Sequence, residues 1–106
     1  METRRTMQIF DKHHWGDLTL NEDLQLRGLI SGTVTVPDGI HLEVDGMIAG
    51  DLIVQQGGRA TIRGMVNGIV QNDGGEVDIF GMVDSVRDLG EGKTRIDGGA
   101  VIRDQE

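Results

Sequence analysis

The chain has 106 residues, which suits one small domain, because a second hydrophobic core would need about 100 further residues. Glycine occupies 17 positions and proline 1, and only 3% of residues are aromatic, which suits neither a helical bundle nor a proline-rich disordered tail. Cysteine is absent, so disulfides and cysteine-ligated zinc are excluded. The net charge of −8 argues against nucleic acid and anionic membranes as partners, because both are polyanions.

Neither a targeting segment nor a membrane span is visible in the sequence. Residues 1–16 contain no apolar run like that of a signal peptide, and no segment approaches the ~20 apolar residues of a membrane span. We therefore expect a cytoplasmic protein. The charge is divided along the chain: residues 17–51 carry −6 and residues 73–106 carry −5, whereas residues 52–72 between them carry +2.

An internal repeat dominates the sequence from residue 24 onward. Alternating apolar and polar residues before a shared glycine predict a strand with one buried face in every copy. Stacking one copy per coil places equivalent residues ~4.8 Å apart, which predicts an all-β, single-domain, triangular β-solenoid of about five and a half coils. The copies, spaced by 18, 18, 17 and 17 residues, are LQLRGLISG (24–32), LEVDGMIAG (42–50), ATIRGMVNG (60–68), VDIFGMVDS (77–85) and TRIDGGAVI (94–102).

Residues 1–23 precede the regular repeat and are expected to form an N-terminal cap and an incomplete first coil. The segment GDLTL (16–20) matches GDLIV (50–54), which places part of a coil here. Ile9, Phe10 and Trp15 break the repeat, and we expect these large side chains to lie across the first coil as a lid. A lid would be important because an uncovered solenoid end exposes unpaired strand edges and polymerises.

Within residues 24–102 the repeat predicts apolar columns that face inward and glycine columns at the corners. Corners need a positive φ or the absence of a side chain, and glycine meets both needs. The inward columns are Leu26, Val44, Ile62, Ile79 and Ile96; Ile30, Ile48, Val66, Val83 and Ala100; and Val34, Leu52, Val70, followed by Val86 or Leu89. The glycine columns are Gly28, Gly46, Gly64, Gly81 and Gly98; Gly32, Gly50 and Gly68, with Ser85 in the next place; and Gly39, Gly57, Gly75 and Gly92.

Two further columns flank the first glycine column. The residues before it, Arg27, Asp45, Arg63, Phe80 and Asp97, include opposite charges that predict ion pairs between adjacent coils. The residues after it are Leu29, Met47, Met65 and Met82. Turned outward, they would form an apolar stripe that could bind a partner; turned inward, which is the orientation we favour, they would belong to the core. Beyond the last repeat, the charged tail RDQE (103–106) is expected to blunt the final strand edge.

No pattern indicates catalysis or a bound metal. His13 and His14 are adjacent, so on a strand they point to opposite faces and do not readily ligate one ion, and His41 lies at a distant corner. Asp73, Glu76 and Asp78 lack the glycine-rich repeat of calcium-binding β-helices. Coils of this length are also similar to those of hexapeptide-repeat acyltransferases and carbonic anhydrases, but the histidines do not support that alternative. We expect no enzyme, no cofactor and no metal.

The run GMIAGDLIVQQGG (46–58), with RGMVNGIVQNDGGEVDIFGMVD (63–84), resembles the bactofilin-like, polymer-forming β-solenoid family over about residues 17–102. This resemblance implies stacked coils and end-to-end assembly. In its size, its acidity and its lack of catalytic residues, the chain is also similar to bacterial immunity proteins, which neutralise toxins.

The sequence thus leaves two functional hypotheses, both non-enzymatic. The first is an immunity-type inhibitor, a monomer or small oligomer, that binds and neutralises a cognate basic toxin such as a nuclease. The alternative is a bactofilin-like structural protein that self-assembles end to end into cytoskeletal filaments. For the first, the candidate contacts are the carboxylates Asp73, Glu76, Asp78, Asp84 and Asp88, expected to form one patch, and the methionines Met47, Met65 and Met82.

Overall fold

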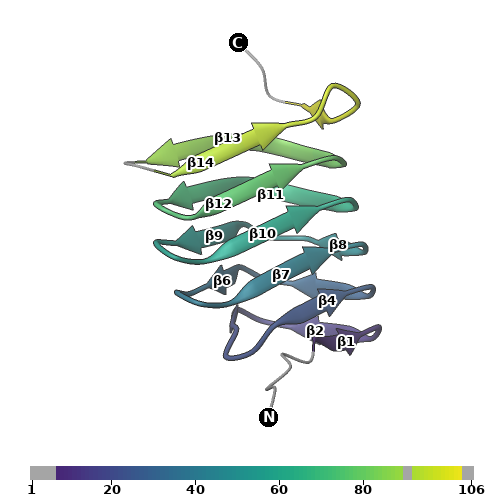
Figure 1. Cartoon of the computed structure of the whole chain (residues 1–106). Coiled ribbons are helices and arrows are strands. Elements are labelled where there is room, and N and C mark those ends of the chain that lie inside the picture. The colour runs from purple at the N-terminus through teal and green to yellow at the C-terminus, as the bar shows by residue number, and fades with distance from the viewer. Residues whose placement is uncertain (1–6, 90–91, 104–106) are drawn as a thin grey trace.

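The computed structural model describes residues 7–89 and 92–103. Strands stack as a β-solenoid whose coils climb from the N-terminal to the C-terminal end of the rod (Figure 1). The named strands pair in parallel with their equivalents in the next coil, and they lie on three faces. The predicted all-β solenoid is confirmed.

Each face is a ladder of short strands. Face 1 contains β1 (Gln8–Phe10), β4 (Leu24–Leu26), β7 (His41–Val44), β10 (Arg59–Ile62), β12 (Glu76–Ile79) and β14 (Lys93–Ile96). Face 2 contains β2 (His13–Trp15), β5 (Leu29–Ser31), β8 (Met47–Ile48), the first parts of β11 (Met65–Asp73) and β13 (Met82–Leu89), and β15 (Val101–Ile102). Face 3 contains β3 (Leu18–Thr19), β6 (Val34–Val36), β9 (Leu52–Gln55) and the second parts of β11 and β13.

The core consists of aliphatic side chains that point inward from all three faces in register. On face 1, Ile62 lies opposite Val44 and Ile79, and all three are 0% exposed. On face 2, Ile48 and Val66 are in register and are equally buried. Burial of this apolar surface, at about 25 cal/mol per Å², is the main stabilising contribution in a chain without disulfides. The predicted inward columns are confirmed through the fifth coil.

The last coil departs from the predicted alignment. Ile96 follows Ile79, but Val101 rather than Gly99 follows Met82, so the corner between them has four residues instead of two. The extra residues form a turn in which the Ala100 N–H donates to the carbonyl oxygen of Asp97 at 3.0 Å. Consequently Ile102, and not Ala100, continues the inward column of face 2.

The structure also decides between the two predicted alternatives on face 3, and it corrects the third glycine column. On face 3 the inward column continues from Val70 to Val86, while Leu89 lies opposite Asp73 and is 40% exposed. The predicted third glycine column combines residues from two adjacent structural positions. The first of these positions has a positive φ in Gly39 at 81°, Gly57 at 84° and Gly74 at 97°, whereas Gly75 and Gly92 share the next position with Gly58.

The first glycine column is required for close approach between coils. A Cβ atom at Gly64 would lie 2.0 Å from the carbonyl oxygen of Gly46, and one at Gly81 would lie 2.1 Å from that of Gly64. None of these residues has a positive φ. A side chain at Gly28, Gly46, Gly64 or Gly81 would therefore push neighbouring coils apart, which explains why the repeat has glycine at this position.

The N-terminal residues do not form the expected lid. β1 pairs with β4, so Phe10 lies in register with Leu26 and packs against the bottom of the core. Ile9 and Trp15 point outward and are 56% and 72% exposed. The lid prediction is wrong because the segment gains backbone hydrogen bonds by joining the ladders, which gives the first coil a strand on each face.

Candidate interaction surfaces

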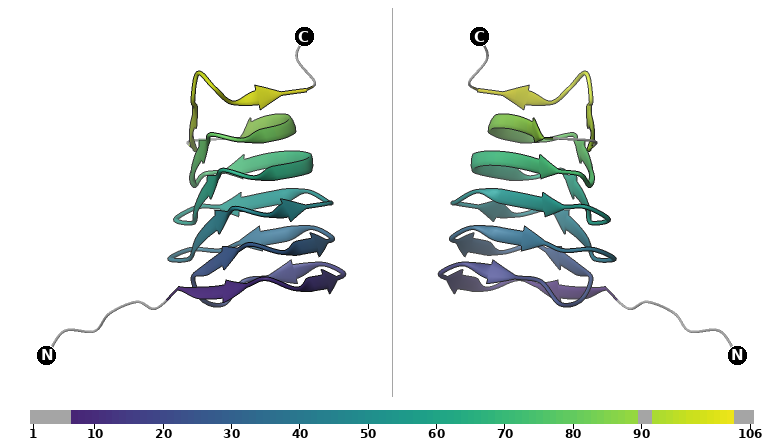
Figure 2. Two further views of the ribbon diagram at one scale, coloured as in Figure 1. Left: turned by 90° about the vertical axis from the view of Figure 1, so that its right-hand side faces the viewer. Right: turned by 90° about the vertical axis from the view of Figure 1, so that its left-hand side faces the viewer.

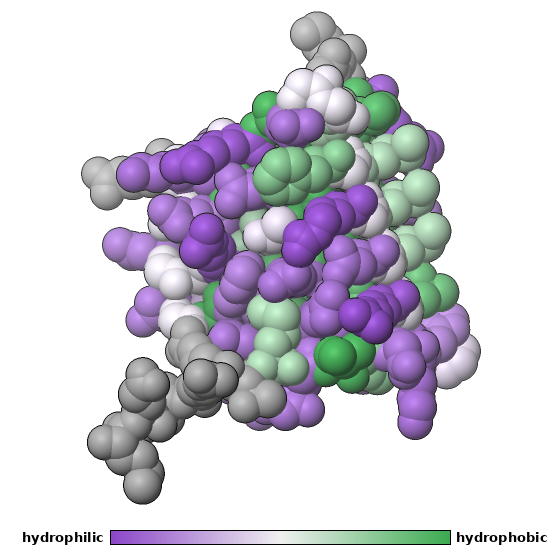
Figure 3. Space-filling model, turned by 45° about the vertical axis from the view of Figure 1, so that its right-hand side comes forward, coloured by the Kyte–Doolittle hydropathy of each residue, from purple (hydrophilic) through white to green (hydrophobic). Residues whose placement is uncertain are grey.

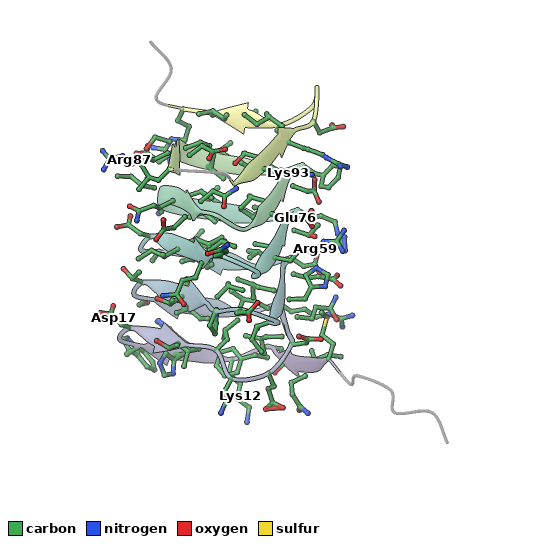
Figure 4. The ribbon with its side chains drawn as sticks, turned by 60° about the vertical axis from the view of Figure 1, so that its left-hand side comes forward. Lys12, Asp17, Arg59, Glu76, Arg87 and Lys93 are labelled. Atoms are coloured by element: carbon green, nitrogen blue, oxygen red, sulfur yellow. The ribbon has the colours of Figure 1, made fainter. Side chains whose placement is uncertain are left out.

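The outer surface of face 1 is charged, and its charges pair between coils. The Arg63 guanidinium donates to Glu43 Oε1 at 2.6 Å and to Asp45 Oδ1 at 3.3 Å, which confirms the predicted ion pair between adjacent coils. Arg59, Glu76 and Lys93 lie one above another along the same face (Figure 4). Exposed pairs contribute only about 0–1 kcal/mol each. Their larger effect is to leave little unbalanced charge on this face.

The carboxylates that we expected to form one patch lie on different parts of the rod. Glu76 and Asp78 project from face 1, where they lie 3.9 Å from Arg59 and 4.0 Å from Arg95, respectively. Asp73 lies at the end of β11 on face 3, across a corner from Glu76, and has no ion-pair partner among the described residues.

Of the other two carboxylates, Asp84 is separated from that group, whereas Asp88 lies one coil above Asp73, next to its register partner Leu89. Asp84 lies between faces 2 and 3, 4.0 Å from Arg103. Asp88 continues the column of the buried Asn72 and accepts a hydrogen bond from the Thr94 hydroxyl at 3.0 Å. The expectation of one acidic patch is wrong because a coil turns a corner every few residues, so neighbours in sequence project in different directions.

The methionine column faces outward, contrary to the orientation that we favoured. Met47 precedes the buried Ile48 and Met65 precedes the buried Val66, and successive residues of a strand point to opposite sides. The alternation of Met47 and Ile48 was the signal that could have decided this from the sequence. The column runs Leu29, Met47, Met65, Met82 and Val101, and apolar surface follows the right-hand edge of the view in Figure 3.

A second outward column lies beside the methionines on face 2. Trp15 at its lower end stacks on His13, with ring centroids 3.7 Å apart and an angle of 24° between the ring planes. Arg103 and Asp84 at its upper end pair with each other. We call the two columns together the methionine face, and the second column consists of Trp15, Ser31, Ala49, Asn67, Asp84 and Arg103.

A groove that was not predicted from the sequence follows the corner between faces 3 and 1. It has a volume of about 570 Å³, and its floor includes the glycine pairs 57–58 and 74–75. His41, Arg59 and Glu76 line one side, and the latter two form an ion pair. The consecutive glycines were the available signal, because two residues without side chains leave a hollow at the same place in successive coils.

Both ends of the rod leave strand edges and core side chains uncovered among the described residues. At the C-terminal end Ile96 is 49% exposed, whereas its equivalent one coil below, Ile79, is 0% exposed. At the N-terminal end the side chains of Phe10, His14 and Leu18 line an opening of about 150 Å³. The views from two sides show no described strand beyond either terminal coil (Figure 2). Of the predicted charged tail, residues 104–106 lie outside the described residues.

The histidines are not grouped with other metal ligands. His13 faces outward and bonds to the Ser31 hydroxyl, whereas His14 lies in register with the inward-facing Ile30, so the two point in opposite directions as predicted. His41 lies 3.3 Å from the Thr61 hydroxyl. Within residues 7–89 and 92–103, no group of three or more His, Cys, Asp or Glu side chains could hold a metal ion.

The comparisons with known proteins add no relative: no family model, curated protein or solved structure matches the chain. The described part of the chain also has no helix of the length and apolarity needed to cross a bilayer. By its fold, the protein belongs to the structural class of β-solenoid repeat proteins.

Proposed function

We propose that this protein is a non-enzymatic, bactofilin-like structural protein of the cytoplasm that assembles end to end. The observation that supports this proposal is that both ends of the rod, in the part of the chain that the structure describes, carry unpaired strand edges and exposed core side chains. Within the described residues, both terminal coils present parallel strands without an outer neighbour and apolar side chains that continue the core columns. Such an edge is a template for pairing with another chain.

Head-to-tail stacking extends the ladders with strands that remain parallel. β1 of the next copy follows β14, which places Phe10 of that copy over Ile96 in the inward column of face 1. On face 2, β2 of the next copy follows β15, which places His14 over Ile102. Face 3 ends one strand lower, in β13, and the chain after Arg103 lies outside the described residues.

The test is the size of the assemblies as a function of protein concentration. We expect the wild type to form rods or filaments in electron micrographs at physiological salt, and Ile96→Lys to abolish them, because a charge would then lie between stacked cores. Ile53→Lys, which changes an outward residue of face 3, is the matched control and should assemble normally. A wild type that stays at the mass of one or two chains up to hundreds of micromolar would refute end-to-end assembly.

The net charge of −8 favours a second candidate, the immunity-type inhibitor of a basic toxin. Its binding surface could not be the single patch first expected. Asp73 and Glu76 lie on either side of the corner at Gly74 and Gly75, and they are the carboxylates that we assign to this binding surface.

Co-expression with a panel of toxic basic nucleases tests this candidate. Rescue of growth against one nuclease, lost on reversing the charges of Asp73 and Glu76 and retained in Arg59→Glu, would support it. Absence of rescue across the panel together with filament formation would leave the structural role as the better account.

A further inference from the structure

We infer that the methionine face is a binding surface for a second copy of this chain, in an antiparallel, two-fold symmetric dimer. This lateral contact goes beyond end-to-end assembly and does not depend on it, because it uses the side of the rod and not its ends.

The charge of the methionine face is what favours a second copy as its occupant. Two chains that each carry −8 repel one another unless they meet through a neutral surface. Asp84 and Arg103, the only full charges on this face, lie together at one end and pair with each other. Face 1 is also nearly neutral overall, but its charged side chains are paired in water, and covering them would cost desolvation that the methionine face avoids.

Two copies can face each other through this surface in two symmetric arrangements, and only one of them brings the two methionine columns into contact. When the two-fold axis runs parallel to the strands, the rods are antiparallel and the methionine column of one copy faces the methionine column of the other. Met47 of one copy then faces Met65 of the other. With the axis along the rod, the methionine column lies on the second column, and Met65 faces Asn67. Methionine side chains adapt to one another in shape, so the antiparallel arrangement is the better packed.

The second column is also self-complementary in the antiparallel arrangement. Trp15 in the first coil of one copy meets Arg103 in the sixth coil of the other, and the symmetry makes this contact twice. A guanidinium over an indole ring is a favourable cation–π geometry. The Trp15 ring is already held against His13 although it is 72% exposed, so little conformational freedom is lost on binding. Between the ends, Ser31 faces Asp84.

The size of the face predicts a weak dimer. Strands spaced by about 4.8 Å extend about 24 Å over six coils, and three residues across a strand span about 10 Å. This footprint, about 240 Å² per copy, is well below the ~800 Å² per partner of a standard protein interface. We therefore expect a dissociation constant in the high micromolar to millimolar range.

Disulfide trapping tests the arrangement. Because the chain contains no cysteine, any cross-link must join the introduced cysteines. Ser31→Cys and Asp84→Cys should give a covalent dimer when the two variants are mixed and oxidised, and little when either is oxidised alone, because equivalent positions lie about three coils apart across the axis. The matched control is a mixture of Thr35→Cys and Arg87→Cys, at corresponding coils of face 3, which should not cross-link. Efficient dimers from either variant alone would place equivalent positions next to each other, which the antiparallel arrangement does not allow, and would overturn the proposal.

Sedimentation equilibrium separates this contact from end-to-end assembly. In the Ile96→Lys background we expect the mass of two chains at high concentration, and adding Met65→Lys should weaken dimerisation at least tenfold without changing the circular dichroism. Met65→Lys alone should still stack if the ends assemble. If Ile96→Lys is a monomer at all concentrations and the mixed cysteines do not cross-link, the lateral dimer is refuted, whatever the ends do.

Discussion

Asn72 Oδ1 accepts a hydrogen bond of 2.8 Å from the Gly75 N–H, and the Asn72 side chain is 0% exposed. It occupies the inward position that Val54 fills one coil below. The amide also donates to the Lys93 carbonyl at 3.0 Å and to the Thr94 hydroxyl at 2.9 Å, so it links the corner of its own coil to two residues of face 1 in the last coil. A buried polar side chain is tolerated here because its hydrogen bonds are made.

The first prediction is that Asn72→Val is destabilising although it restores an apolar inward column. The substitution leaves the Gly75 N–H and the Lys93 carbonyl without the partners described above, and a buried unpaired group such as the Gly75 N–H costs about 1–3 kcal/mol. Urea unfolding should show a lower midpoint than for Gln71→Val, the outward neighbour on the same strand. A midpoint equal to that of the wild type would show that water or a small shift replaces both hydrogen bonds.

The second prediction concerns close approach between coils. Gly64→Ala should destabilise the fold by about 1–3 kcal/mol, because the new Cβ must displace the carbonyl oxygen of Gly46. Gly98→Ala is the control, since a Cβ there meets nothing within 4 Å and neither residue has a positive φ. Thermal unfolding of both variants compares them directly, and equal melting temperatures would contradict the account of this glycine column.

The third prediction tests the inward and outward assignment on one strand. Val54→Asp should prevent folding or destabilise it severely, because an unpaired carboxylate would lie in a site that is 0% exposed. Ile53→Asp changes the adjacent outward residue, whose neighbours on the ladder are the uncharged Thr35 and Gln71, and should remain folded. Circular dichroism and thermal melts decide this, and similar losses for the two variants would contradict the assignment.

The fourth prediction is that loss of the Arg63 ion pairs changes the free energy of unfolding only slightly. Arg63→Ala removes contacts to Glu43 and Asp45, but the Arg63 side chain is 48% exposed, so the loss should not exceed about 1 kcal/mol and should shrink at high salt. Unfolding at low and high ionic strength measures it. A loss of several kcal/mol that persists in salt would mean that the arginine stem contributes packing rather than charge.

The sequence by itself determined the solenoid and most of its core. A spacing of 17–18 residues with alternation before each glycine is enough to stack Val44, Ile62 and Ile79, because a strand has a side-chain period of two and a repeat places equivalents on neighbouring coils. The ion pair of Asp45 with Arg63 followed from the same column logic. These features depend only on local spacing.

Only the tertiary structure decided where the corners send each side chain. The turn at Asp97 to Ala100 contains two more residues than its equivalent, and this moved Ile102 into the core in place of Ala100. The carboxylates of residues 73–88 separated because the chain turns corners between them, and the first coil joined the ladders because strand pairing satisfies its backbone. A repeat fixes which residues are equivalent, but the path of the backbone through each corner depends on contacts with the coil below, which are distant in the sequence.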